Sequence, residues 1–130
     1  GHFGNRSPIA EAAAELGAAG FAALPLDYPD LELLAEAICT SAPAAPTFYH
    51  ADEVETSIML ALAPALVRME LAAPEYPAFP ASFGAEPIML HTFCHSGVFG
   101  DPTPATAEKG QRLLEGIVAA SLREIAAFLA

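Results

Sequence analysis

One stretch constrains the fold of this chain more than any other, and it reads His50-Ala51-Asp52-Glu53-Val54-Glu55-Thr56-Ser57. An apolar segment, Ile58-Met59-Leu60-Ala61-Leu62-Ala63, follows it directly. Acidic residues suit the positive end of a helix dipole, so the pattern predicts a loop that leads into a buried helix. An imidazole and three carboxylates at a helix start are ligand types that suit zinc, manganese or iron. The alternative is a capped helix whose acidic side chains lie in water.

The composition is that of a globular domain, or of part of one. Among 130 residues, 54% are hydrophobic and 16% are charged, which favours a folded chain over a disordered one. The net charge of −11 argues against nucleic acid and anionic membrane surfaces as partners. No apolar run reaches the roughly 18–20 residues of a membrane span, and the first residues do not form a signal peptide. Two cysteines are too few for a disulfide scaffold, so we expect a cytoplasmic location.

Hydrophobic periodicity divides the chain into helices and short strands. Helices are expected from an N-cap at Ser7 to about Gly17, over Pro29–Ile38, from Glu53 to near Pro64, and from Thr103 or Pro104 onward. Strands are expected over Gly20–Leu26 and Ile88–Phe93, and an irregular loop over Ala72–Pro87. This alternation predicts the α/β class, with a mainly parallel sheet flanked by helices. So small a sheet has poor cover, and we therefore expect it to be incomplete in this chain.

The closing helix has an apolar stripe and a charged face. The stripe consists of Leu114, Ile117, Val118, Leu122, Ile125 and Leu129, and the face that should be mostly in water includes Lys109.

Two histidines lie next to features that favour ligand binding. His2 lies in a glycine-rich turn before a helix, where the backbone can approach a ligand closely, although a surface or hydrogen-bonded histidine is the plainer interpretation. His50 and Glu55 can converge on one point only if the loop between them bends. The intervening Asp52 and Glu53 are interpreted as solvated acids at the helix cap.

A second group, His91, Cys94 and His95, has metal-ligand chemistry but an unfavourable spacing. On a strand, His91 and His95 would share a face while Cys94 points away. We therefore interpret this group as structural, with His95 near a pocket.

Three stretches together resemble the creatininase family of metal-dependent amidohydrolases. Gly1-His2-Phe3-Gly4-Asn5 is similar to the end of that family's Asn-Gly-His-Gly-Gly-Asn motif. The stretch from His50 to Ser57 is similar to its His-Ala-Gly-x-x-Glu-Thr-Ser motif, with Asp52 in place of the usual Gly. A closing motif is matched by Ser96-Gly97-Val98-Phe99-Gly100-Asp101-Pro102-Thr103 and by Ala105-Thr106-Ala107-Glu108-Lys109-Gly110. Order and spacing agree across nearly the whole chain.

The resemblance implies a doubly wound α/β domain with a binuclear centre of divalent metal ions, and hydrolysis of a non-peptide or cyclic amide C–N bond. It implies that His2 and Glu55 are metal ligands close enough to share one ion, and that His50 donates a proton or orients the substrate. The residues expected to bind substrate are Phe3, Asn5, His95, Ser96 and Gly97. It also implies a small-molecule amide as the substrate and a homo-oligomer, often a hexamer, as the assembly.

Two departures from the family pattern bear on the substrate. Creatininase proper carries a Glu two residues after the first His, where this chain has Gly4, and it has pocket tryptophans, whereas this chain has none. These differences argue against creatinine itself, and other family members act on formamides of pyrimidine intermediates or on the C-terminal residues of a modified peptide.

The resemblance also places residues 1–130 in the carboxyl-terminal portion of a single creatininase-like domain. The Glu-x-His pair and bridging Asp of the family's first half do not occur here, so we expect the chain alone to be inactive. Two rival interpretations stay open. One is a non-catalytic half-domain that packs on a partner or on its own N-terminal half, and the other is an α/β binding module without metal.

Overall fold

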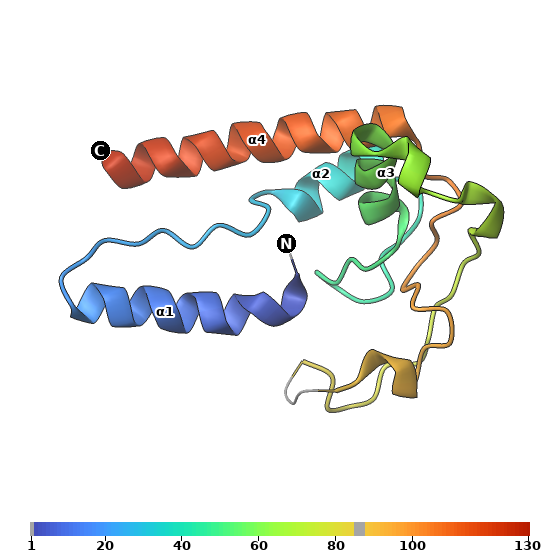
Figure 1. Cartoon of the computed structure of the whole chain (residues 1–130), viewed down its shortest axis with the longest axis horizontal. Coiled ribbons are helices and arrows are strands. Elements are labelled where there is room, and N and C mark those ends of the chain that lie inside the picture. Colours follow the sequence, from blue (N-terminus) through green and yellow to red (C-terminus); the bar gives the residue numbers. More distant parts are fainter. Residues whose placement is uncertain (1, 85–87) are drawn as a thin grey trace. The chain divides into compact units, whose positions relative to one another are not determined.

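The computed structural model describes residues 2–84 and 88–130. In this part of the chain the α-helices are α1 (Arg6–Ala18), α2 (Leu31–Ile38), α3 (Glu53–Leu62) and α4 (Ala107–Leu129), as Figure 1 shows. Short 3₁₀ helices lie at Phe3–Asn5, Pro64–Leu66, Met69–Leu71 and Leu90–Thr92. The chain forms two compact units, one of Gly1–Leu31 with Glu115–Ala130 and the other of Glu32–Leu114.

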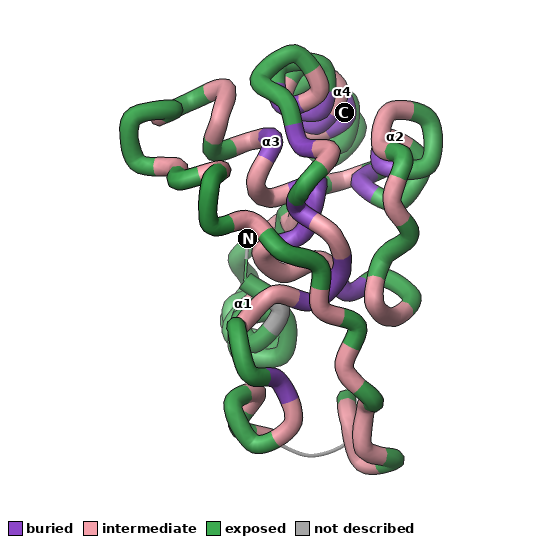
Figure 2. The backbone as a smooth tube through the Cα atoms, turned by 90° about the vertical axis from the view of Figure 1, so that its right-hand side faces the viewer, coloured by how far each residue is buried: buried purple, intermediate pink, exposed green. Residues whose placement is uncertain are grey.

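The first unit contains α1, whose existence the sequence predicted correctly. The expected N-cap at Ser7 is wrong, because the 3₁₀ turn at Phe3–Asn5 runs directly into a helix that begins at Arg6. The Ser7 hydroxyl instead donates a hydrogen bond of 2.8 Å to Glu11. No residue of α1 is buried, and Figure 2 shows the helix exposed along nearly its whole length. Ion pairs in this unit join Arg6 to Asp27 and Arg123 to Asp30.

The second predicted helix is confirmed as α2 but starts two residues later than Pro29. Tyr28 and Asp30 have φ angles of 46° and 61°, so the backbone there is left-handed and cannot belong to a right-handed helix. Leu31 and Ala35 of α2 are buried.

The helix predicted from Glu53 is confirmed as α3, which spans Glu53–Leu62. The Asp52 carboxylate caps it by accepting hydrogen bonds of 3.0 and 3.1 Å from the N–H groups of Val54 and Glu55. The helix ends before Pro64, which cannot donate a backbone hydrogen bond and starts a short 3₁₀ turn instead.

The first turns of α4 pack closely against α3 (Figure 1). Gly110 makes this possible, because a Cβ at that position would lie only 1.9 Å from the carbonyl oxygen of Ser57. Ser57 is fully buried, and its hydroxyl accepts a hydrogen bond of 3.2 Å from the Thr106 N–H. Thr106 in turn caps α4, since its hydroxyl accepts a hydrogen bond of 3.1 Å from the Lys109 N–H. Helix α4 therefore begins at Ala107, three residues after Pro104.

The predicted apolar stripe of α4 is only partly correct. Ile117 is buried, but the other buried apolar side chains of this helix are Leu113 and Ala120, which lie outside the expected stripe. Val118 and Leu122 are 55% and 61% exposed. None of the described helices combines the length and apolar character that crossing a membrane requires.

An aromatic cluster forms the other core of the second unit. Phe48, Cys94 and Phe99 are buried, and Phe79 and Phe93 pack against them. The Phe48 and Phe99 rings meet edge to face with centroids 5.2 Å apart, a favourable geometry for aromatic pairs. The sequence segments that meet here come from before, within and after the proline-rich loop, whose irregular structure is as predicted for residues 72–84. Residues 85–87 of that predicted loop lie outside the described residues.

Both predicted strands are wrong. Gly20–Leu26 is an extended chain without strand pairing, and Ile88–Phe93 contains a 3₁₀ turn at Leu90–Thr92. An extended segment becomes a strand only when a neighbour accepts and donates its backbone hydrogen bonds. Within residues 2–84 and 88–130, backbone pairing of that type is limited to isolated antiparallel bridges, such as His50 with Phe99 and Glu75 with Gly100. The mainly parallel sheet is thus not formed by the described residues.

The close contact of α3 with α4 predicts opposite effects for two glycine substitutions. Gly110→Ala should lower the free energy of unfolding by about 3 kcal/mol, because backbone must move to admit the methyl group. Gly17→Ala on α1, where a Cβ meets nothing within 4 Å, should raise it by about 0.5–1 kcal/mol. Urea unfolding of both variants tests this, and equal effects would contradict the packing described here.

Candidate functional site

The start of α3 brings His50 and Glu55 together. The loop bends at Ala51, whose φ of 51° turns the backbone left-handed. The Ala51 N–H then donates a hydrogen bond of 2.7 Å to Oε2 of Glu55, and Nδ1 of His50 lies 3.8 Å from the same oxygen. The bend that convergence of these two side chains requires is therefore present.

The His50–Glu55 pair is accessible to a ligand. Their side chains are 36% and 39% exposed, so neither is enclosed by the core. An imidazole nitrogen and a carboxylate oxygen 3.8 Å apart are too far apart for a direct hydrogen bond but can contribute two donor atoms to one cation. The pair thus has the chemistry of part of a metal or acid–base site.

Aromatic side chains form the wall behind His50. The Phe99 N–H donates a hydrogen bond of 3.0 Å to the His50 carbonyl, so the backbone of His50 is fixed on that side. The His50 ring centroid lies 5.6 Å from that of Phe99 and 6.2 Å from that of Phe48. The imidazole of His50 therefore packs against two phenylalanine rings, and its Nδ1 faces Glu55.

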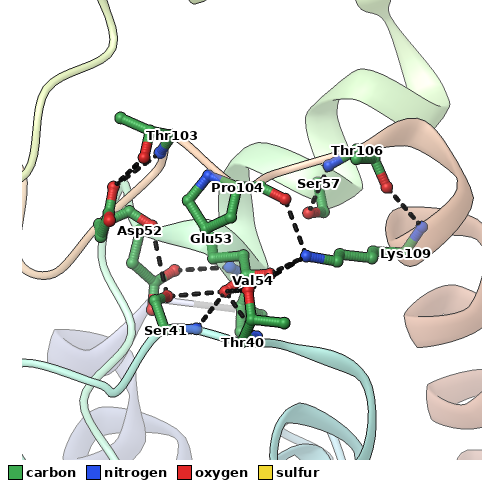
Figure 3. Close-up of polar contacts among 11 residues, drawn as sticks. Thr40, Ser41, Asp52, Glu53, Val54, Ser57, Thr103, Pro104, Thr106 and Lys109 are labelled. Atoms are coloured by element: carbon green, nitrogen blue, oxygen red, sulfur yellow. Dashed lines mark hydrogen bonds and ion pairs between the residues drawn. The ribbon is translucent and has the colours of Figure 1, made fainter.

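Glu53, interpreted from the sequence as a solvated acid, is 1% exposed, and that interpretation is wrong. Its carboxylate accepts hydrogen bonds from the N–H and hydroxyl groups of Thr40 and Ser41, and it pairs with the ammonium of Lys109 (Figure 3). Lys109, expected in water, donates a further hydrogen bond of 2.8 Å to the Pro104 carbonyl. A buried charge requires such partners, and the sequence pattern of α3 alone does not show where they come from.

The ion pair sets the charge state of Glu53. Burial alone would raise the pKa of Glu53, but hydrogen bonds from Lys109 and Ser41 outweigh it and lower that pKa to about 2. Glu53 is therefore ionised at neutral pH and acts as a fixed structural charge. Through its partners, Glu53 links three segments of the chain: Thr40 with Ser41, the start of α3, and the first turn of α4.

Asp52 is a cap residue as expected, but it is not solvated. It is 3% exposed, and burial raises its pKa to about 6, although the N–H groups of Glu55 and Val54 act in the opposite direction. The interpretation of Asp52 as a solvated acid is therefore wrong, because the neighbouring turn at Gly100 covers it. A Cβ added at Gly100 would lie 3.1 Å from the Cβ of Asp52.

The predicted substrate-binding residues His95, Ser96 and Gly97 form one exposed turn. Glu75 organises it, since its carboxylate accepts hydrogen bonds of 2.8 Å from the N–H groups of His95 and Ser96 and a further one from the Ser96 hydroxyl. Gly97 has a φ of 83°, a conformation that other residues rarely adopt. Sequence reasoning missed Glu75, because it lies in a proline-rich loop about 20 residues away.

The remaining predicted ligands belong to the first unit. His2 is exposed, and its carbonyl accepts a hydrogen bond of 2.9 Å from the Asn5 N–H. Asn5 immediately precedes α1 and makes no side-chain cap, while the side chain of Phe3 lies outside the described part. His2 and Glu55 belong to different units, and the ion that they would share stays a prediction.

The donors present fit part of a metal site. His50 and Glu55 are a suitable pair, but among the described residues no three or more His, Cys, Asp or Glu side chains are arranged to hold an ion. His91 and His95 are exposed, and the Cys94 thiol is buried and donates to the Val98 carbonyl at 3.3 Å. A complete site needs donors beyond these.

A pocket of about 460 Å³ lies between α2 and the start of α3 on the second unit. Its lining includes Glu32, Glu36 and Asp52, together with Cys39 and Tyr49. Burial and the nearby Glu53 raise the pKa of Cys39 to about 11, so its thiol is not activated as a nucleophile. The pocket therefore offers carboxylates without a reactive partner, and the His50–Glu55 pair remains the stronger candidate.

Comparison with known proteins bears on nearly the whole chain. A sequence model of the creatininase family, described as creatinine amidohydrolase, matches residues 1–125. A structure of a tryptophan-to-phenylalanine mutant creatininase aligns at 28% identity and a TM-score of 0.65, over 92% of this chain and 50% of that chain. A glutamate-to-glutamine mutant creatininase complexed with creatine aligns at 26% identity and a TM-score of 0.67, over 92% of this chain and 50% of that one.

A third structure, named Creatininase Mn, aligns at 26% identity with a TM-score of 0.67, over 96% of this chain and 52% of its own. No curated protein sequence gives a significant match. The chain thus spans about half the length of the creatininase structures it resembles. Those structures have an α/β fold, which agrees with the predicted class, whereas the described residues of this chain are rich in helix.

The buried ion pair predicts a large cost for removing its cation. Lys109→Met should lower the free energy of unfolding by about 3–5 kcal/mol, because Glu53 would keep a buried charge without a partner. Arg112→Met, at an exposed position one turn later, is the matched control and should change little. Chemical denaturation compares the two variants. Adding Glu53→Gln to Lys109→Met should recover part of the loss, and equal losses in the two single variants would show that Lys109 is not a structural residue.

The raised pKa of Asp52 predicts a stability difference that depends on pH. A carboxyl group whose folded pKa exceeds its unfolded value stabilises the fold when protonated, and this contribution is lost as the pH rises from about 4 to about 6. Asp52→Asn keeps a capping side chain that never ionises. Its stability relative to wild type should therefore rise by about 1–3 kcal/mol between about pH 4 and about pH 8. Glu15→Gln on exposed α1 should give a flat difference, and a flat difference for Asp52→Asn would refute the buried charge.

Proposed function

The chain belongs to the creatininase family, and from that membership we propose that the intact protein is a metal-dependent amidohydrolase that cleaves a non-peptide or cyclic amide C–N bond. The match over residues 1–125 supports this, together with one structural observation. The family's second motif folds so that His50 and Glu55 meet at an accessible helix start. An accessible imidazole and an accessible carboxylate supply a possible proton donor and a possible metal ligand for hydrolysis with a bound cation.

We assign Glu55 as a metal ligand and His2 as a second one. The Ala51 N–H fixes Oε2 of Glu55, which holds the carboxylate in one orientation before any ion binds. Divalent ions, with manganese, zinc and iron as candidates, would lower the pKa of a bound water molecule and polarise the amide carbonyl. The remaining ligands are expected from the half of the creatininase length that this chain does not span. The name Creatininase Mn supports manganese for that protein.

We assign His50 as the residue that gives a proton to the leaving nitrogen. Its Nδ1 faces Glu55, so Nε2 is the ring nitrogen left for the substrate. An imidazole suits this transfer because its ordinary pKa lies near neutrality, and positioned acid–base groups accelerate reactions by roughly 10²–10⁴-fold. The rings of Phe48 and Phe99 limit its rotation.

The substrate is proposed to be a small amide other than creatinine. The chain has no tryptophan, and Gly4 occupies the place where creatininase proper carries a Glu. Phe3, Asn5 and the turn from His95 to Gly97 are the proposed contacts with that substrate. A homo-oligomer in the cytoplasm remains the expected state.

A non-catalytic half-domain is the second candidate, and one observation favours it. Apolar side chains of the first unit, among them Phe21, Leu122 and Leu129, are more than half exposed. Such surfaces favour packing against further protein. The two candidates differ in whether the protein binds metal and turns over an amide.

The test uses the intact protein loaded with manganese or zinc. Metal content measured by plasma emission and hydrolysis of a panel of formamides and cyclic amides should both be positive. His50→Ala should lower kcat by two or more decades while metal content stays near wild type, since only the proton donor is lost. Glu55→Gln should lose metal and activity together.

Other outcomes in these variants would change the assigned roles. Loss of metal in His50→Ala would make His50 a ligand, and full turnover in that variant would make it structural. Residues 1–130 alone should be inactive, because a catalytic site needs about three protein ligands. Stoichiometric metal and full turnover from these residues alone, or no metal in the intact protein, would each contradict the proposal.

A further inference from the structure

Glu75 engages the turn of His95–Gly100 with both its side chain and its backbone. Oε1 accepts from the His95 N–H at 2.8 Å, and Oε2 accepts from the Ser96 N–H at 2.8 Å and from the Ser96 hydroxyl. Its backbone forms both hydrogen bonds of an antiparallel bridge with Gly100, at 2.9 and 2.8 Å. One residue of the proline-rich loop therefore fixes both ends of the turn.

The same turn reaches His50 on its other side. Phe99, next to Gly100, donates its N–H to the His50 carbonyl at 3.0 Å, and its buried ring lies against the imidazole. The turn therefore lies between Glu75 and His50, with a backbone bridge to each of them, and all three belong to the second unit. The backbone and side-chain contacts of Glu75 can be tested separately. Its backbone bonds to Gly100, which lies next to the residue that contacts His50, whereas its carboxylate bonds to His95 and Ser96.

Few interactions within the turn of His95–Gly100 fix its conformation. Gly97 and Gly100 have φ angles of 83° and 129°, and glycines lose more conformational freedom on ordering than other residues. His95 and Ser96 are exposed, so core packing does not fix them. Within the turn, the Ser96 hydroxyl accepts a hydrogen bond of 3.1 Å from the Val98 N–H. Because the Ser96 hydroxyl also donates to Glu75, the carboxylate of Glu75 orients the hydroxyl that accepts from Val98.

We infer that Glu75 is a positioning residue, whose carboxylate presents the turn of His95–Gly97 to the substrate while its backbone steadies the turn that backs His50. This inference rests on the proposed function, which places the substrate at that turn. Glu75 does not touch the reacting atoms and acts only through the turn. Hydrogen bonds from the His95 N–H and from Ser96 lower the pKa of Glu75 to about 2, so the carboxylate is ionised at any working pH.

The experiment is Glu75→Gln in the intact, metal-loaded protein. The amide keeps the shape but turns an NH₂ group toward backbone donors, so at least one hydrogen bond is lost, while the backbone bridge to Gly100 remains. KM for the amide substrate should rise about tenfold, with kcat within about twofold and metal content unchanged. Glu70→Gln, which changes an exposed acid five residues earlier in the chain, should leave KM as in wild type.

Hydrogen exchange of the His95 and Ser96 amides supplies a readout that does not depend on activity. Both should exchange faster in Glu75→Gln than in wild type or Glu70→Gln. Faster exchange with an unchanged KM would overturn the positioning role, and an unchanged exchange rate would overturn the contact itself. A wild-type protein without amide turnover would overturn the proposed function and this inference, while the exchange data would still show whether the contact exists. If Glu75→Gln fails to fold, Ser96→Ala removes both hydrogen bonds of that hydroxyl, the one to Glu75 and the one from the Val98 N–H. Exchange of the His95 and Ser96 amides should then be faster than in wild type, and an unchanged exchange rate would count against the inference.

Discussion

The buried ion pair of Glu53 with Lys109 is the contact on which the second unit depends. It joins the start of α3 to the first turn of α4, and the same carboxylate takes hydrogen bonds from Thr40 and Ser41. A buried carboxylate without these partners would cost several kcal/mol, so the three segments that supply them are held in contact. The ion pair therefore helps to fix α3, the helix that carries Glu55, against the first turn of α4.

Three carboxylates within four residues have different roles because their surroundings differ. Asp52 is buried against Gly100 and caps α3, Glu53 is buried against Lys109, and Glu55 is partly exposed beside His50. One turn of helix directs successive side chains about 100° apart, so neighbours meet unlike environments. Two of the acids therefore build the helix start, and the third is left accessible beside His50.

Sequence reasoning predicted what depends on local signals. All four α-helices were expected close to their observed places, because caps, prolines and a 3.6-residue period are written into neighbouring residues. The convergence of His50 and Glu55 was allowed by the sequence and is realised by the left-handed Ala51. The strands at Gly20–Leu26 and Ile88–Phe93 were wrong, since strands depend on distant partners that a local pattern does not contain.

The same limit explains the missed site residues. The partners of Glu53 come from 12 and 56 residues away, and Glu75 reaches the turn of His95 across 20. A surface acid and a buried acid look alike in a sequence, because only the fold supplies the cation or the N–H groups. Long-range polar contacts therefore had to be seen in the structure.

We propose that the start of α3 and the glycine-rich turn at His2 each supply one ligand of the same metal centre. The most direct test is a crystal structure of the intact protein grown with manganese, with the ion located by its anomalous scattering. The account predicts an anomalous peak in contact with the carboxylate of Glu55 and the imidazole of His2, with His50 beside it. A structure in which no ion binds Glu55, or in which His2 and Glu55 lie too far apart to share one ion, would contradict it.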